Sequence, residues 1–165
     1  MGKKILILFL FLFVIISIAG CSEETSNDKD IFESGEEAII TNNNGNEMYS
    51  IKIEEAKVAD DFEYKEDFSE NTTQIVEVEY TYKNIAQEDA LLYIHGQDLQ
   101  VVDQQNKVAE SSDMFPKQQP QDSGVGTEVT VQAYYGLENE SEEIQVILRS
   151  EMYDSEIEYR IPVTK

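Results

Sequence analysis

The densest group of side chains that could do chemistry is the acidic stretch "ADDFEYKEDFSENTT", from Ala59 to Thr73. Hard cations such as Ca²⁺ bind clustered carboxylate oxygens, so this stretch is a candidate cation loop. The D-x-[DN]-x-[DN]-G spacing of a calcium loop is absent, and a solvated acidic loop is the competing interpretation. The six carboxylates belong to Asp60, Asp61, Glu63, Glu66, Asp67 and Glu70.

The same stretch carries three aromatic residues between its charges, Phe62, Tyr64 and Phe68. Aromatic rings supply contact area while charges select the partner, so the loop is also a candidate surface for a basic envelope or host protein. In the alternative interpretation the rings pack back onto the domain and hold the loop down. Met114 and Phe115, in a second polar loop, present the same two alternatives.

Catalytic signatures do not appear elsewhere in the chain. The one histidine, His95, has no second histidine for a metal site, and no G-x-S-x-G or glycine-rich phosphate loop occurs. Paired carboxylates can cleave glycosidic bonds, but with 34 acidic residues the proximity of some pair carries no information. We therefore expect a non-enzymatic protein without a cofactor, with an envelope hydrolase as the weaker alternative.

The only cysteine, Cys21, follows an N-terminal segment with the features of an export signal. Lys3 and Lys4 precede twelve consecutive apolar residues, "ILILFLFLFVII", which is a signal-peptide profile. The apolar run is slightly short for a membrane span, which needs about 20 residues. An ordinary secretory signal and an uncleaved membrane anchor are two interpretations of this segment. Both place the rest of the chain outside the cytoplasm, as does the third interpretation, which follows from the residues around Cys21.

The segment "IAGC", from Ile18 to Cys21, resembles the lipobox of bacterial lipoproteins. The resemblance implies cleavage after Gly20 and acylation of Cys21, and hence a protein anchored by lipid on the extracytoplasmic face of the cell membrane. Two or more acyl chains give stable anchoring because each buried methylene contributes about 0.8 kcal/mol. With Cys21 committed to lipid, no disulfide can form.

Charge excludes one class of partner. The chain has 12 basic and 34 acidic residues, a net charge of −22, and removing residues 1–20 takes Lys3 and Lys4 away and leaves −24. Such a surface repels phosphate backbones, so nucleic-acid binding is dismissed. It also repels an anionic leaflet, so the domain is expected to stand away from the bilayer.

Alternating polar and apolar residues predict short strands along most of the remaining chain. The clearest is "TQIVEVEYTYKN", in which Val76, Val78, Tyr80 and Tyr82 would face inward and Glu77 and Glu79 would face solvent. Pro162 cannot donate to a ladder and predicts an edge position for the last strand. Further strands are expected in segments around Ile51, Leu92, Val101, Val131, Val146 and Tyr159.

Seven to eight strands without a convincing helical segment predict an antiparallel β-sandwich, with a barrel as the alternative. Residues 1–20 are expected to be the signal peptide, 21–46 an acidic flexible tether, and 47–165 the sandwich. Within the tether, Ile39 and Ile40 could still pair as a short edge strand.

Three segments resemble an uncharacterised family of Gram-positive lipoprotein domains with an immunoglobulin-like sandwich. They are "VEVEYTYKN", "HGQDLQVVDQQNKV" and "GTEVTVQAYYGLENESEEIQVIL", starting at Val76, His95 and Gly126. Two departures are "QQNK" at a turn that usually contains glycine, and Val125-Gly126 in place of Pro-Gly. The resemblance implies an immunoglobulin-like fold used for contact or sensing in the envelope, and it transfers no catalytic residue.

Overall fold

The structure is a computed structural model that describes residues 31–88 and 90–165. The expected signal peptide and lipid-bearing Cys21 lie outside the described residues. Within the described part, no helix is long and apolar enough to span a membrane.

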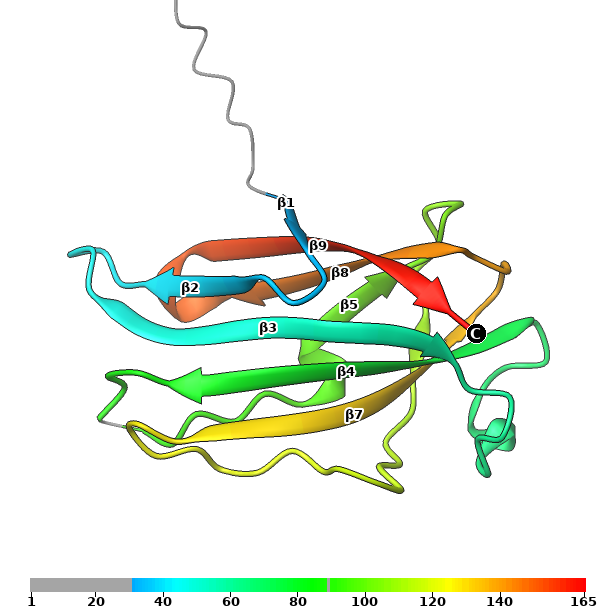
Figure 1. Ribbon diagram of the computed structural model, residues 1–165, viewed down its shortest axis with the longest axis horizontal. Coiled ribbons are helices and arrows are strands. Elements are labelled where there is room, and N and C mark those ends of the chain that lie inside the picture. The colour runs from blue at the N-terminus through cyan, green and yellow to red at the C-terminus, as the bar shows by residue number, and fades with distance from the viewer. Residues whose placement is uncertain (1–30, 89) are drawn as a thin grey trace, which may run out of the picture.

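The described chain folds into nine strands and three short 3₁₀ turns, and an all-β fold is confirmed (Figure 1). The alternation of β-branched or aromatic residues with polar ones is what produces strands here, because one side of each strand is buried. The strands are β1 (Ile31–Glu33), β2 (Glu37–Thr41), β3 (Glu47–Val58), β4 (Gln74–Asn84), β5 (Leu99–Val102), β6 (Glu110–Ser111), β7 (Glu128–Leu137), β8 (Glu143–Ser150) and β9 (Ser155–Thr164). The turns are η1 (Lys65–Asp67), η2 (Gly96–Asp98) and η3 (Glu151–Tyr153).

The strands form two layers that share one seam. One layer contains β5, β8, β9 and β1, and the other contains β2, β3, β4, β7 and β6. The end of β9 pairs with β3, at Ala56↔Val163 and Lys57↔Thr164, and this pairing joins the layers along one side. Figure 1 shows β9 and β8 above β3, β4 and β7.

The sandwich is mixed and not purely antiparallel as the sequence pattern predicted. Strand β9 runs parallel to β1 and to β3, whereas the other ladders are antiparallel. The hairpin signals in a sequence report neighbours along the chain. They carry no information about how the last strand meets strands far earlier in the chain, and both parallel pairings, of β9 with β1 and with β3, are of this kind.

Within the described residues, strands are already present from Ile31, sixteen residues before the boundary expected from composition. The segment expected to be tether contains β1 and β2, and Ala38 and Ile40 are fully buried in the core. The edge pairing anticipated for Ile39 and Ile40 is present, since β2 forms an antiparallel hairpin with β3. Composition misled because the two strands are short, with three and five residues, and the chain around them is polar.

The expectation that Pro162 marks an edge strand is wrong. Strand β9 lies between β8 on one side and β1 and β3 on the other. The Val163 amide donates to the Glu142 carbonyl beside β8, so the nitrogen of Pro162 faces the opposite side. On that side the pairing with β1 ends at Arg160 and the pairing with β3 begins at Val163. The missing N–H therefore falls in a gap between two ladders.

Four tyrosines fill the space between the layers and form hydrogen bonds to the main chain of neighbouring segments. Tyr80, Tyr82, Tyr135 and Tyr159 are almost fully buried. Their hydroxyls donate to main-chain carbonyls, for example Tyr80 to Ile94 at 2.9 Å and Tyr135 to Gly96 at 2.7 Å. A buried hydroxyl must find a partner, so these bonds position the extended segment 91–96 against the core.

The turn "QQNK" has a left-handed residue although it contains no glycine. Asn106 has a positive φ of 61°. Asparagine tolerates this left-handed conformation better than most residues. The buried carboxylate of Asp103 accepts from the amides of Gln105 and Lys107 and closes the turn.

Candidate functional site

The acidic loop between β3 and β4 is held against the outer face of the sheet by a small aromatic cluster. Phe62 and Phe68 are only 4% and 8% exposed, and they pack with Ala59 and with Tyr134 of β7. The rings of Phe62 and Tyr134 stack with centroids 4.3 Å apart. The interpretation in which these two phenylalanines face a partner is therefore wrong, and the alternative in which they hold the loop down matches their burial.

A glycine in β7 makes room for one of these rings. A Cβ built on Gly136 would lie 2.7 Å from Cδ1 of Phe68 and 2.9 Å from Oγ1 of Thr72. Any side chain at position 136 would displace the loop. The close seating of Phe68 on the strand thus depends on the absence of a side chain at this position.

The carboxylates of the loop point the other way, into solvent. Asp60, Asp61, Glu63, Glu66, Asp67 and Glu70 are all exposed, so the structure divides the predicted residues into buried rings and exposed acids. Within the described residues, no three His, Cys, Asp or Glu side chains come close enough to hold a metal ion. The acids present a negative surface on the loop and not a converging set of ligands.

A buried carboxylate lies under the loop. Glu77 of β4 is 2% exposed and stands opposite Lys57 of β3 and Tyr134 of β7 in the ladders. Its Oε1 meets the Lys57 ammonium at 2.8 Å, and its Oε2 accepts from the Tyr134 hydroxyl at 2.6 Å. Lys117, from the loop before β7, donates to Oε2 at 2.7 Å. One carboxylate thereby joins three strands, β3, β4 and β7, to the loop that carries Lys117.

The surroundings of Glu77 keep it ionised. Burial alone would raise the pKa of its carboxyl, but the hydrogen bonds from Lys117, Lys57 and Tyr134 outweigh burial and hold the pKa below its usual value. The bond to Glu77 raises the pKa of Lys57 to about 12. Burial and then the same carboxylate raise the pKa of Tyr134. The group is a stable ionic junction at neutral pH.

The acidic loop also contacts the segment that carries β6. The Ser69 amide donates to Oε2 of Glu110 at 2.7 Å, and the Ser112 hydroxyl donates to Oδ2 of Asp67 at 3.2 Å. Together with the packed rings of Phe62 and Phe68, these bonds fasten the loop at several separate points along its length. Its carboxylates are consequently presented from a fixed frame.

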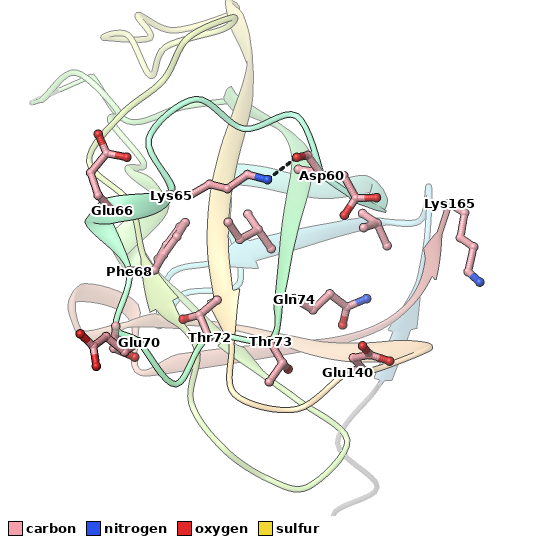
Figure 2. Close-up of a pocket in the computed structure, with 14 residues that line it drawn as sticks. Asp60, Lys65, Glu66, Phe68, Glu70, Thr72, Thr73, Gln74, Glu140 and Lys165 are labelled. Atoms are coloured by element: carbon pink, nitrogen blue, oxygen red, sulfur yellow. Dashed lines mark hydrogen bonds between the residues drawn. The ribbon is translucent and has the colours of Figure 1, made fainter.

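Beside the loop lies an open hollow of about 670 Å³, shown in Figure 2. Lys65 reaches across the loop to the carbonyl of Asp60, while Gln74, Glu140 and Lys165 lie on the sandwich side. The Gln74 side chain exchanges hydrogen bonds with the main chain of Ser141, at 3.3 and 2.8 Å, which makes this wall rigid. Val58, Ala59, Phe68 and Ile75 contribute apolar side chains to the lining.

The lining of the hollow is acidic with two basic exceptions. Asp60, Glu66, Glu70 and Glu140 contribute carboxylates, and Lys65 and Lys165 contribute ammonium groups. Such a lining favours the binding of cationic side chains of a partner over anionic ones, as do the exposed carboxylates of the neighbouring loop. The hollow therefore extends the negative surface and adds apolar side chains to it.

His95 has a structural role in the turn that begins η2. Its ring Nδ1 accepts from the Gln97 amide at 3.2 Å, and its own amide donates to Asp98 at 2.6 Å. This reciprocal pair caps the turn, which accounts for a histidine immediately before Gly96.

Sequence reasoning missed the residues that organise the site. Glu77 was expected to face solvent, and its alternation with Val76 and Val78 does place it on the outer face. That face is covered by the acidic loop and by Lys117, so Glu77 is buried. No signal in the sequence identifies a covered outer face, because the cover comes from segments distant along the chain.

No known family profile and no curated protein match the sequence. Solved structures that share the fold include the following three. MPT63, a secreted protein from Mycobacterium tuberculosis, is 14% identical with a TM-score of 0.61 over 83% of this chain and 99% of its own. The yjhA protein from Bacillus subtilis is 11% identical, with a TM-score of 0.54 over 81% and 99%.

The third structure is ycdA from Bacillus subtilis, a candidate lipoprotein. It is 14% identical, with a TM-score of 0.55 over 70% of this chain. The match spans 36% of ycdA, so this chain corresponds to about a third of that protein. At these identities the likeness shows a shared fold.

Proposed function

We propose that the protein is a lipid-anchored, extracytoplasmic, non-enzymatic binding module whose acidic loop contacts a basic envelope or host protein. The "IAGC" segment and its resemblance to a lipobox support the anchor. The shared fold with a secreted protein and a candidate lipoprotein is in keeping with an extracytoplasmic location. The resemblance to immunoglobulin-like lipoprotein domains supports a contact role.

The observation that carries the proposal is the division of the loop into buried rings and exposed acids. Phe62 and Phe68 are sequestered, and the carboxylates around them are held in solvent. The loop is fixed by these two rings and by its bonds to Glu110 and Ser112. A fixed charged surface loses little conformational entropy on binding, which favours association. A loop that served solubility alone would not need several anchoring points.

Charge complementarity dictates how such a module would behave. A net charge of −22 attracts a basic protein from a distance and accelerates encounter, and salt screens the attraction. Binding through the loop should therefore weaken between low and physiological ionic strength, mainly through a slower association rate.

The anchor also limits how far the module reaches. The first described strand, β1, begins at Ile31, ten residues after Cys21. Ten residues span at most about 33–36 Å when fully extended, so Ile31 of an anchored protein would stay within that distance of the bilayer. The partner must accordingly lie within reach of a domain that is held at the membrane surface.

The loop is tested by comparing two charge-neutralised variants of equal net charge. The first carries D60N, D61N, E63Q, E66Q and D67N in the loop. The control carries E47Q, E88Q, D122N, E128Q and E151Q, five exposed acids at the opposite end of the sandwich. Capture of basic proteins from the native cell surface should fall at least tenfold for the first variant only. Equal losses in both would refute the assignment to the loop.

The anchor is tested separately with labelled palmitate. We expect the label to enter the wild-type protein and to be absent from Cys21→Ala, which should be released from the membrane fraction. A Cys21→Ala protein that stays membrane-bound would show that the N-terminal segment is an uncleaved anchor.

A further inference from the structure

We propose that a groove beside the acidic loop, continued by a row of partly exposed rings, docks an extended segment of the partner in which cationic and apolar side chains alternate. This inference rests on the proposed function and adds to it the place and the chemistry of the contact. The groove has a volume of about 380 Å³ and is lined by Tyr64, Asp113, Met114, Phe115, Pro116 and Gln119.

Both walls of the groove are held in place. On one wall the Tyr64 ring packs edge-on against buried Phe62, with centroids 5.7 Å apart. On the other wall the Ser112 hydroxyl accepts from the Met114 amide at 3.0 Å, and Phe115 packs against the main core. The Ser112 hydroxyl also bonds to Asp67, so the two walls are connected directly. The groove is a preformed feature of the surface.

A row of rings leads away from the groove. Phe115 contacts His95 edge-to-face at 4.8 Å, and His95 stacks with Tyr93 at 6.3 Å. Tyr93 belongs to the extended segment 91–95, in which Leu92 and Ile94 are buried while Leu91 and Tyr93 are 60% and 47% exposed. The outward side chains of this segment therefore form an exposed apolar strip that continues the groove.

Charge complementarity identifies the occupant. Acidic side chains accompany the apolar surface along its length: Glu63 and Asp67 near Tyr64, Asp113 in the groove, and Asp98 beside His95. Arg and Lys side chains pair with such acids and also pack on aromatic faces. Apolar side chains between them would fill the groove and cover the strip. The strip follows an extended backbone, so a segment with alternating side chains matches its geometry.

The same charges exclude other occupants. A second copy of this chain carries the same net charge of −22, and an anionic membrane would be repelled as well. The surface thus selects a basic protein segment. Two parts of this surface contribute differently to binding. The acids attract any cation, whereas the groove and strip distinguish apolar side chains of the partner from polar ones.

Two synthetic peptides of twelve residues separate these contributions, one alternating arginine with leucine and the other alternating arginine with serine. Their charges are equal. The protein is used from residue 21 onward with Cys21→Ser, which retains every described residue. The test variant is Tyr93→Ser with Met114→Ser, and the matched control is Ile39→Ser with Met152→Ser, which removes two exposed apolar side chains elsewhere.

Titration calorimetry should show the leucine peptide binding at least tenfold more tightly than the serine peptide to the wild type and the control variant. In the Tyr93/Met114 variant this difference should fall below threefold while serine-peptide binding is retained. Equal binding of both peptides by the wild type, or a difference that survives in that variant, overturns the inference. Serine-peptide binding unaffected by neutralising the five loop acids would instead contradict the proposed function of the loop.

Discussion

Phe62 of the acidic loop stacks on Tyr134 of β7, with ring planes inclined by 22° and centroids 4.3 Å apart. The hydroxyl of the same tyrosine donates to the buried carboxylate of Glu77. The stack thus connects a surface loop to an ionic junction on the sheet. Offset aromatic pairs contribute about 0.5–1.5 kcal/mol beyond the area they bury. The acidic surface depends on this contact for its shape.

Truncating Phe62 should release the loop. Phe62→Ala removes the stack and leaves a cavity, which we expect to cost about 2–4 kcal/mol of unfolding free energy. Chemical denaturation measures the loss, and limited proteolysis should show new cleavage between residues 59 and 73. Phe62→Leu, which keeps most of the apolar volume, should recover at least half of the loss. Unchanged proteolysis in Phe62→Ala would contradict the role of the stack.

Adding a methyl group at Gly136 should have a similar effect from the opposite side. The new Cβ would overlap the Phe68 ring, so Gly136→Ala should destabilise the protein by about 1–3 kcal/mol. Gly124→Ala is the control, because its nearest neighbour would lie 4.0 Å away. Thermal unfolding of the two variants compares them. Equal melting temperatures for the two variants would contradict the close packing of Phe68 on Gly136.

Removing the charge of Glu77 should make stability less sensitive to acid. Because the pKa of Glu77 is lowered by folding, its contribution is complete above the unfolded value, about 4.3, and is lost as the pH falls through the folded value. Glu77→Gln should therefore cost about 1–3 kcal/mol at pH 7 and much less near pH 2. Urea denaturation at both pH values gives the difference. A cost independent of pH would show that Glu77 acts by packing and not by charge.

The position of the domain boundary can be tested by truncation. A chain starting at Ile31 should melt within a few degrees of one starting at residue 21. A chain starting at Glu47 lacks β1 and β2, including buried Ala38 and Ile40, and should lose about 4 kcal/mol or more. Circular dichroism follows both transitions. Equal melting temperatures for all three chains would show that residues 21–46 do not stabilise the domain and would support their interpretation as a tether.

Calcium provides a test of the alternative function of the loop. Since no three potential ligands converge within the described residues, millimolar Ca²⁺ should leave the thermal midpoint unchanged, and a chelator should not lower it. Scanning calorimetry with Mg²⁺ as the control cation measures the shift. A midpoint raised by Ca²⁺ but not by Mg²⁺ would establish a calcium site.

The strand pattern was predictable to the extent that each strand has one buried side. Val76, Val78, Tyr80 and Tyr82 are fully buried, as their alternation indicated, and the strands around Val131, Val146 and Tyr159 are also present. The segment around Leu92 is different, because it alternates correctly but makes only an isolated bridge with Ser123. Alternation reports which side faces the core and not whether a partner strand is adjacent.

The local sequence by itself determined the all-β class, the acidic character of the loop and the positions of most strands, because these depend on residues close together in the chain. Tertiary structure alone decided that Phe62 and Phe68 turn inward, that Glu77 is buried between Lys57 and Lys117, and that β9 runs parallel to β1 and β3. Each of these contacts joins residues 20 or more positions apart. The free energy of such contacts comes from surfaces that meet only after folding, so no local pattern encodes them.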